Sequence, residues 1–326
     1  MNEAILREWL AHATGDASLC ITALTRLSGG AIQQNWALDV GFRGEERRWV
    51  LRSDAPTKLA FSHSRAAEFA LLRAARDAGV NVPAALYLCE DCAVIGRPFF
   101  IMARVEGVAA AHRVVKMFPA NGDVMAEKLG AELAKLHAIR PPRDDLNFLG
   151  APPADSALAG IAAMRARLDA AGTPRPILEW GLRALERNAP APLSPVLCHN
   201  DFRTGNIMLT TDRVVAVLDW EFAGWGDPHA DLGWFCAKCW RFGNVAMEAG
   251  GIGTRAAFEA GYAAHHPIDQ ACLPWWELFA TLRWAVIAAD QAMRHISGEE
   301  RSLELALTGH IVPELEWDIL AMAEAL

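Results

Sequence analysis

The spacing of apolar positions changes about a third of the way along the chain. Residues 1 to about 102 contain short apolar runs typical of strands, among them Pro98-Phe99-Phe100-Ile101-Met102. They surround one clear helical pattern, predicted over Ser64 to Ala78, because Ser64 is a favourable N-cap and Phe69 and Leu72 follow at helical spacing. From about residue 108 the spacing is mostly helical. The pattern therefore predicts a small, sheet-rich part followed by a larger helical part.

The larger part is not predicted to be equally regular throughout. One helix is expected from Asp123 to Ile139, because Leu129, Leu133 and Leu136 share a face. Residues 140 to 195 are rich in Ala and Pro, so we expect them to be irregular between helices. The final third is expected to be helical, with most of its tryptophans in the core.

One short unit, residues 196 to 221, differs from both patterns. Its apolar runs predict three short strands, at Val196 to Cys198, at residues 206 to 209 and at Val214 to Leu218. Two antiparallel strands of this length would bring Asn206 and Asp219 together, with Asp201 in the loop above them. That loop begins with His199.

These residue types suit the transfer of a phosphoryl group. Such a reaction needs a base for the accepting hydroxyl and oxygen ligands for magnesium. An Asn206 carbonyl and an Asp219 carboxylate are suitable magnesium ligands, and Asp201 is then free to orient the hydroxyl and accept its proton. Any one of these residues is common in turns. Their joint placement on predicted strands and a loop indicates a site.

This segment resembles the aminoglycoside phosphotransferase and choline kinase-like enzymes, which are distant relatives of protein kinases. The stretch Gly226-Asp227-Pro228-His229-Ala230-Asp231-Leu232-Gly233-Trp234 also resembles the family's GDPxxDLG motif. The resemblance implies an α+β, bilobal, protein kinase-like fold, with an antiparallel-sheet lobe and a larger helical lobe. It implies a nucleotide-covering lobe at 1–102, an inter-lobe hinge at 103–107 and a helical lobe at 108–326, which carries the catalytic loop and acceptor site.

The resemblance also implies roles for individual residues of the larger lobe. Asp201 would be the catalytic aspartate, and Asp219 would take the place of the DFG aspartate as a magnesium ligand with Asn206. His199 would brace the loop. Asp231 would begin a helix beneath the loop and hold its backbone, and an Asp is also a good N-cap in its own right. Arg203 would either stabilise phosphate charge or form a structural ion pair.

The smaller lobe is expected to contribute nucleotide contacts. Ser28, Gly29 and Gly30 would form a phosphate-covering hairpin, although two adjacent glycines are also common in plain turns. Arg52 stands where protein kinases carry a lysine, and a guanidinium can bind phosphate bidentately. Glu68 would form an ion pair with Arg52; a surface glutamate on a helix is the simpler alternative.

The end of the apolar run at residues 98–102 resembles the segment that joins the two lobes. Met102, Ala103 and Val105 would present backbone groups to the adenine edge, and Gly107 suits a change of chain direction. An ordinary strand and turn would explain the same residues.

Composition narrows the class of protein. The 326 residues carry a net charge of −8 with no basic block, which argues against nucleic-acid binding. No long uncharged apolar run predicts a membrane span, and the acidic N-terminus does not resemble a signal peptide. Seven cysteines fit reduced thiols and a cytoplasmic location. The Cys89/Cys92 and Cys236/Cys239 pairs have zinc-ligand spacing, but the resemblance places one pair in each lobe.

The expected function is ATP- and magnesium-dependent transfer of the γ-phosphoryl group to a hydroxyl of a small molecule. The acceptor is expected to be a hydroxyacyl compound or an amino sugar, because some similar sequences occur beside acyl-CoA dehydrogenases. A cationic amino sugar would need an acidic pocket, for which Glu314, Glu316 and Asp318 are candidates, although such runs usually face solvent. The alternatives are a nucleotide-binding pseudokinase and a protein kinase. The oligomeric state stays open.

Overall fold

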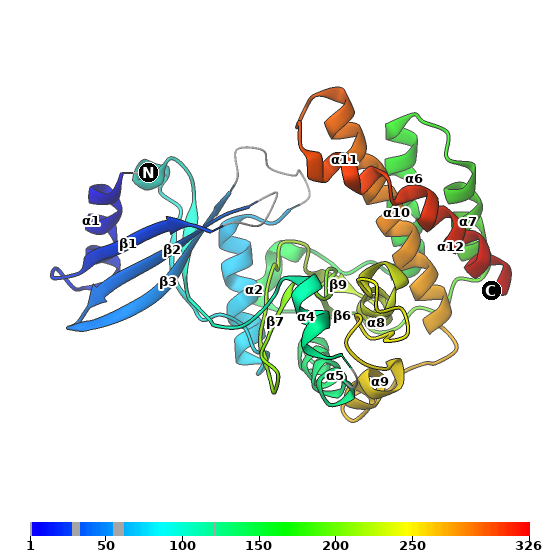
Figure 1. Ribbon diagram of the computed structural model, residues 1–326, viewed down its shortest axis with the longest axis horizontal. Helices are drawn as coiled ribbons and strands as arrows, with labels where there is room; N and C mark the ends of the chain where they lie inside the picture. The colour runs from blue at the N-terminus through cyan, green and yellow to red at the C-terminus, as the bar shows by residue number, and fades with distance from the viewer. Residues whose placement is uncertain (1, 28–32, 55–61, 120–121) are drawn as a thin grey trace.

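The computed structural model describes residues 2–27, 33–54, 62–119 and 122–326, which form a sheet-rich part and a larger helical part (Figure 1). The sheet is antiparallel and has the strand order β1-β2-β3-β5-β4. Its strands are β1 (Cys20–Arg26), β2 (Gln33–Phe42), β3 (Glu45–Asp54), β4 (Ala85–Cys89) and β5 (Phe99–Ala103). The predicted α+β fold, with an antiparallel sheet preceding a helical part, is confirmed.

Both faces of this sheet are covered, because apolar side chains alternate along its strands. On β5, Phe99 and Ile101 pack with helix α1 (Glu3–Thr14), whereas Phe100 packs with helix α2 (Arg65–Asp77). The predicted helix at Ser64 to Ala78 is confirmed as α2, and the Ser64 side chain accepts a hydrogen bond from the Ala67 N–H. The prediction of a single main helix was incomplete. α1 and the short α3 (Cys92–Ile95) also belong to this part.

α1 was missed because its apolar signal is short. Only Leu6 and Leu10, four residues apart, give it a fully buried apolar stripe. Local capping is its other support: the Asn2 side chain accepts a hydrogen bond from the Ala4 N–H, and Gly15 ends the helix in the left-handed region.

The predicted strand–loop–strand unit is present in the helical part. Its strands are β6 (Val196–Cys198), β7 (Ile207–Leu209), β8 (Val214–Val217) and β9 (Gly224–Gly226). β7 pairs antiparallel with β8, and β6 pairs with β9. The chain enters this part beside β7, where Val108 and Leu209 exchange backbone hydrogen bonds of 2.8 and 2.9 Å. A Cβ at Gly107 would lie 2.9 Å from the Leu209 carbonyl oxygen, so this close approach requires glycine.

The remaining elements are mainly helices. They are α4 (Ala111–Met117), α5 (Asp123–His137), the 3-10 helices η1 (Asp144–Leu149) and η2 (Lys238–Trp240), α6 (Ser156–Ala171), α7 (Pro176–Arg187), α8 (His229–Cys236), α9 (Arg255–Ala263), α10 (Leu273–Ser297), α11 (Leu303–Gly309) and α12 (Val312–Ala325). The predicted helix at Asp123 to Ile139 is α5, two residues shorter. Within the part of the chain that the structure describes, no helix has both the length and the hydropathy of a membrane span.

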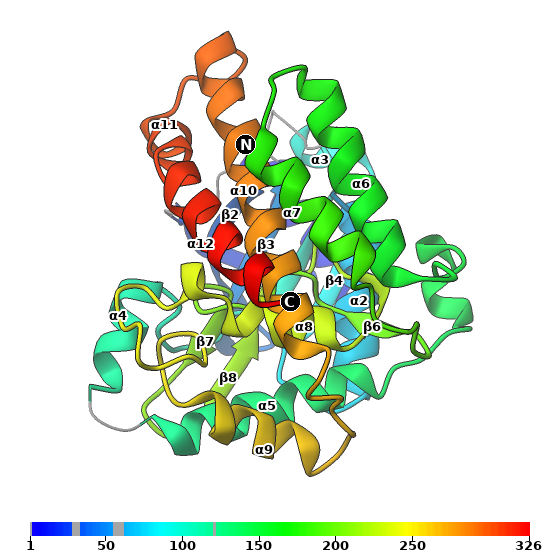
Figure 2. The same ribbon diagram turned by 90° about the vertical axis from the view of Figure 1, so that its right-hand side faces the viewer.

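The segment from 140 to 195 corrects our expectation of irregular structure, because it contains α6 and α7. Leu178, Leu182 and Leu185 are fully buried and form the stripe of α7, and Pro176 occupies its first turn, where a missing N–H costs nothing. α6 is rich in alanine and has little amphipathic pattern of its own. α7 packs beside α10 and α12, and α6 packs against α7 and α10 (Figure 2), so tertiary contacts stabilise them more than local pattern does.

Candidate active site

The loop between β6 and β7 is held from below by Asp231. Its carboxylate accepts hydrogen bonds from the backbone N–H groups of His199, at 2.6 Å, and Asn200, at 2.8 Å. His137 Nε2 lies 3.2 Å from the same carboxylate. Burial alone would raise the pKa of Asp231, but the His137 contact and the backbone N–H of His199 outweigh it and lower the pKa. These contacts match the loop-holding role that the resemblance implies.

Asp231 is nevertheless not the N-cap of its helix, so that expectation was wrong. α8 begins two residues earlier, at His229, with Pro228 before it. Asp227 makes the early start possible, because its carboxylate accepts a hydrogen bond from the His229 N–H at 2.8 Å.

His199 connects the loop with the strand that precedes Asp219. Its Nδ1 accepts a hydrogen bond from the Asp201 N–H at 3.2 Å, so Nε2 carries the proton and donates to the Leu218 carbonyl at 3.0 Å. The side chain is fully buried. Both ring nitrogens are therefore engaged in holding the backbone, as expected for a bracing residue.

The structure brings Asp201, Asn206 and Asp219 together. Asn206 Nδ2 donates to Asp201 Oδ2 at 2.5 Å and to the Asp201 carbonyl at 3.0 Å. The Leu218 N–H donates to the Asn206 carbonyl at 2.7 Å, which extends the β7–β8 pairing and sets Asp219 beside Asn206. Arg203 Nε donates to Asp201 Oδ1 at 3.0 Å. Arg203 thus forms an ion pair with Asp201, one of the two roles left open.

Asp219 is joined to the sheet by Arg52. Arg52 Nη2 lies 2.6 Å from Asp219 Oδ1 and 2.9 Å from Glu68 Oε1, and its Nε donates to Glu68 Oε2 at 3.0 Å. The predicted Arg52–Glu68 ion pair is therefore present. Arg65, which the sequence did not single out, is also buried and forms an ion pair with Glu68. Its i,i+3 spacing from Glu68 on α2 is the local signal that could have found this contact.

The charges in this cluster support one another. Burial alone would lower the pKa of Arg52, but Glu68 and Asp219 more than compensate and raise it. Burial likewise would raise the pKa of Asp219, but Arg52 holds it below its usual range. The Asp219 side chain keeps 33% of its surface exposed, so an ion or ligand can still reach it.

Two non-glycine residues of this region have left-handed backbone conformations. Asn200 has φ of 62° and Asp219 has φ of 65°. Such conformations are uncommon outside glycine and concentrate at functional sites, where the surrounding structure stabilises them. Here the Asp231 carboxylate holds the N–H of Asn200, and Arg52 holds the side chain of Asp219.

The expected adenine-binding segment follows β5. Met102 and Ala103 end that strand, and Val105 lies between it and Val108. The Ala103 N–H donates to the Ala84 carbonyl at 2.9 Å, so this donor is already used. Ser28, Gly29 and Gly30, the expected phosphate-covering residues, lie outside the described residues.

The two C-x-x-C pairs occupy different elements. Cys89 ends β4 and Cys92 begins α3, whereas Cys236 ends α8. Burial raises the pKa of Cys236 to about 12, so this thiol packs as a small apolar group. All seven cysteines are unpaired.

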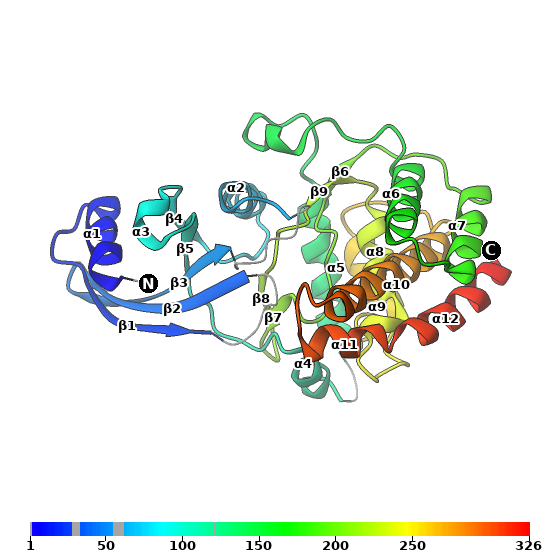
Figure 3. The ribbon, with the colours of Figure 1, turned by 90° about the horizontal axis from the view of Figure 1, so that it is seen from above.

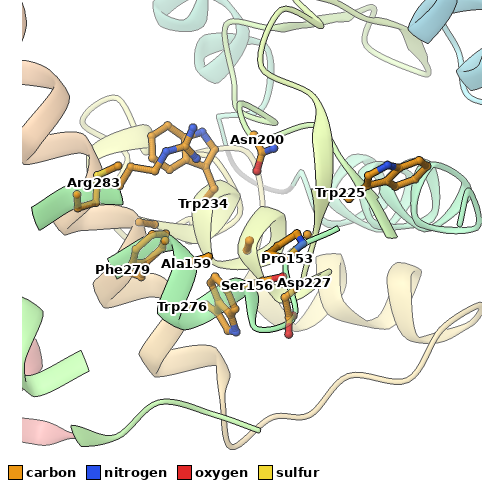
Figure 4. Close-up of a pocket in the computed structure, with 15 residues that line it drawn as sticks. Pro153, Ser156, Ala159, Asn200, Trp225, Asp227, Trp234, Trp276, Phe279 and Arg283 are labelled. Carbon is orange, nitrogen blue, oxygen red and sulfur yellow. The ribbon is translucent and has the colours of Figure 1, made fainter. Parts of the chain in front are cut away.

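Sequence reasoning missed two residues beside Asp201. The Trp234 indole N–H donates to Asp201 Oδ1 at 3.1 Å, and the Arg283 guanidinium lies 4.5 Å from the Trp234 ring centre. Trp234 closes the GDPHADLGW stretch, which is the signal that could have found it. Arg283 lies on α10, far along the chain, and has no such signal. Trp234 and Arg283 both line a cavity of about 230 Å³ (Figure 4).

A sequence model of the phosphotransferase enzyme family matches residues 23–269. The chain belongs to this family. Acyl-CoA dehydrogenase family member 10 of Mus musculus is 27% identical to the chain over 293 residues, a match that covers 84% of this chain but 27% of the relative. The chain therefore spans about a quarter of that relative's length. The family expected from the motifs is confirmed.

Solved structures show the same fold. A candidate aminoglycoside phosphotransferase from Ralstonia eutropha JMP134 has a TM-score of 0.78 at 23% identity, covering 99% of this chain and 98% of its own. Spectinomycin phosphotransferase, solved with ADP and spectinomycin, has a TM-score of 0.65 at 12% identity, covering 100% of this chain and 99% of its own. The likeness confirms the expected protein kinase-like fold, and family membership supports a small-molecule phosphotransferase.

Proposed function

We propose that the protein transfers the γ-phosphoryl group of ATP, in the presence of magnesium, to a hydroxyl of a small molecule. The observation that carries this proposal is the convergence of Asp201, Asn206 and Asp219 from one loop and two paired strands. Family membership and a structural neighbour solved with ADP support it.

Each residue then has a role that its contacts allow. Asp201 orients the acceptor hydroxyl and receives its proton, while Trp234 and Asn206 hold its carboxylate in place. Arg203 also donates a hydrogen bond to the Asp201 carboxylate. From that position its guanidinium can face the transferred phosphate.

The donor set fits magnesium. The Asn206 amide nitrogen faces Asp201, so its amide oxygen and the partly exposed Asp219 carboxylate would supply the hard oxygen ligands that magnesium prefers. When bound, the ion would neutralise charge on the ATP phosphates. Arg52, positioned by Glu68, would contact phosphate, and the segment from Met102 to Val105 would border the adenine.

For the acceptor, we propose a hydroxyacyl compound over an amino sugar. The matched relative is named as a member of an acyl-CoA dehydrogenase family. The acidic residues considered for a cationic acceptor are also largely engaged, because Asp318 lies 2.7 Å from Lys238 and Glu316 lies 3.8 Å from Arg175. The unpaired cysteines fit a reducing, cytoplasmic location.

A nucleotide-binding pseudokinase is the second candidate, and one observation favours it. Arg52 Nη2 occupies Asp219 Oδ1, at 2.6 Å, which leaves the other carboxylate oxygen as the one without this contact. Transfer that uses Arg52 as a phosphate contact needs this ion pair to loosen when nucleotide binds, whereas a sensor does not need that change.

Phosphoryl transfer from magnesium-ATP to a panel of hydroxylated metabolites, antibiotics and hydroxyacyl-CoAs tests the proposal. We expect Asp201→Ala to lower kcat by about 10²- to 10⁴-fold while ATP affinity, measured by calorimetry, stays unchanged. Asp212→Ala is the matched control, because Asp212 is an exposed aspartate in the β7–β8 turn.

The outcomes separate the two candidates. A product made by the wild type and the Asp212→Ala variant, but not by Asp201→Ala, establishes the small-molecule kinase. Tight nucleotide binding with no product from any acceptor supports the pseudokinase. Equal loss of ATP binding and turnover in Asp201→Ala contradicts the role given to Asp201.

A further inference from the structure

The cavity beside the catalytic loop is small and mainly apolar. Its volume of about 230 Å³ is below the range of about 300–1,000 Å³ typical of sites for drug-sized ligands. α6, α8 and α10 form its sides, and Asn200, next to Asp201, borders it (Figure 4; the helices are seen from above in Figure 3). Its apolar lining includes Pro153, Met164, Trp225, Trp234, Trp276 and Phe279. Such a space suits a short hydrocarbon chain rather than a polyhydroxylated sugar.

One charged side chain in this lining stands out. The Arg283 guanidinium stacks on the face of Trp234, yet no hydrogen bond or ion pair links it to any residue that the structure describes. Nearby charges are already engaged. Arg167 forms hydrogen bonds of 2.8 and 2.5 Å with Asp290, and the Asp227 carboxylate contacts the His229 N–H and Nδ1 at 2.8 and 2.9 Å.

Burial makes this cation costly. It lowers the pKa of Arg283, and the Asp201 carboxylate, which opposes that shift, is not hydrogen-bonded to the guanidinium. A partly desolvated cation without a direct counter-ion gains most from an anion that arrives with a ligand. A negatively charged group inside the cavity would therefore stabilise Arg283.

Trp234 fixes the position of this cation relative to the catalytic loop. Its indole N–H holds Asp201 Oδ1 at 3.1 Å, while its ring face supports Arg283. Asn200 donates its Nδ2 to the Phe222 carbonyl at 3.0 Å, which leaves its amide oxygen for a ligand. A hydroxyl at Asp201 and an anion at Arg283 would thus lie at the N–H edge and over the face of the same indole ring, a separation that a short chain spans.

We propose that Arg283 binds the carboxylate of an acceptor whose hydroxyl lies at Asp201 and whose hydrocarbon chain packs against the aromatic lining. The inference rests on the proposed function and narrows its hydroxyacyl acceptor to the free hydroxylated carboxylic acid, because a thioester of that acid has no carboxylate for Arg283. Arg283 is then a specificity residue. The same cation repels amino sugars, whose charges have the wrong sign.

Matched substrates test the proposal on the unaltered protein. Initial rates are measured with straight-chain hydroxyalkanoic acids that differ in hydroxyl position, each beside its methyl ester and its amino-alcohol analogue. We expect a kcat/KM for the best acid about tenfold to a hundredfold above that of its ester. A rate for the ester or the amine equal to that of the acid overturns the proposal.

Variants then assign the preference to Arg283. Arg283→Met should raise KM for the acid by about tenfold to a hundredfold and leave the ester nearly unchanged, and Arg283→Lys should keep part of the preference. Arg183→Met is the control, since Arg183 is an exposed arginine on α7. An equal loss for acid and ester in Arg283→Met would overturn the assignment, because it would indicate a general structural role.

A binding measurement without turnover separates this inference from the proposed function. Titration of the same acids into ATP-free protein should change tryptophan fluorescence in the wild type and much less in Arg283→Met, because Trp234 carries the guanidinium. Acid binding lost in Arg283→Met supports the inference even if no acceptor is phosphorylated. Phosphorylation of neutral acceptors alone, with no acid binding, supports the function and overturns the inference.

Discussion

Arg52 stands where the family resemblance leads one to expect a lysine. Its guanidinium makes contacts whose geometry a lysine ammonium group cannot reproduce. Its Nε and Nη2 both reach Glu68, and Nη2 also reaches Asp219. An ammonium group is a compact charge on a flexible stem and cannot present this planar fork. The substitution therefore changes how the two carboxylates are joined, while it keeps the positive charge.

At this residue we expect a graded response. Arg52→Lys should keep part of the activity, and Arg52→Met should raise KM for ATP and lower kcat, because Asp219 loses its partner. Arg52→Met should also destabilise the protein by less than the about 3–5 kcal/mol typical of a broken buried pair, since Arg65 still neutralises Glu68. Steady-state kinetics and urea unfolding measure both effects. Unchanged kinetics in Arg52→Met would contradict a phosphate-binding role.

The lowered pKa of Asp231 predicts that this carboxylate stabilises the folded protein and that its contribution is lost in acid. Its folded-state pKa is lowered, so the unfolded chain binds the proton more readily, and the stabilisation is present above the unfolded pKa of about 3.9. It is lost as the pH falls through the folded pKa. Asp231→Asn should cost about 1–3 kcal/mol at pH 5, because a buried N–H loses its acceptor, and the difference from wild type should shrink at pH 3. Urea unfolding at both values measures it, and a constant difference would contradict the pKa argument.

Among the elements, α5 and α9 meet unusually closely. A Cβ at Gly130 would lie 2.0 Å from the Phe258 carbonyl oxygen, and one at Gly261 would lie 1.9 Å from the Glu127 carbonyl oxygen. Neither neighbour can move without shifting a helix backbone. The two glycines allow α5, which lies beneath the β6–β7 loop, to rest directly on α9.

Gly261→Ala separates this packing from helix propensity. Propensity alone would stabilise the helix by about 1 kcal/mol, whereas overpacking costs about 1–3 kcal/mol, so we expect net destabilisation. Ala260→Gly, at the exposed neighbouring position, is the control and should cost about 0.5–1 kcal/mol. Thermal and urea unfolding measure both variants. A more stable Gly261→Ala protein would show that the helices separate easily.

For the whole molecule, the Arg52–Asp219 pair joins the sheet to the helical part at the place proposed for ATP. A ligand held by both parts stabilises the entire folded state by mass action. We expect magnesium-ATP at one hundred times its Kd to raise the free energy of unfolding by about 2.7 kcal/mol. Differential scanning fluorimetry should show the shift for wild type, and less of it with EDTA or in Asp219→Ala. An equal shift in all three would argue against magnesium at Asp219.

The sequence by itself determined much of the fold and the centre of the candidate site. The strands at 196–198 and 214–217, the helix at 65–77 and its Ser64 cap follow from local patterns, which depend on neighbours a few residues away. Asp201, Asn206 and Asp219 could be grouped because one short hairpin connects them.

Only the tertiary structure decided which distant groups complete that site. Trp234 and Arg283 come from α8 and α10, and α6 is stabilised mainly by its neighbours. Such contacts depend on how whole helices pack, and no local period encodes them. The β6–β7 loop could therefore be predicted from its own residues, whereas the cation and the apolar lining beside it exist only because helices far apart in the chain meet there.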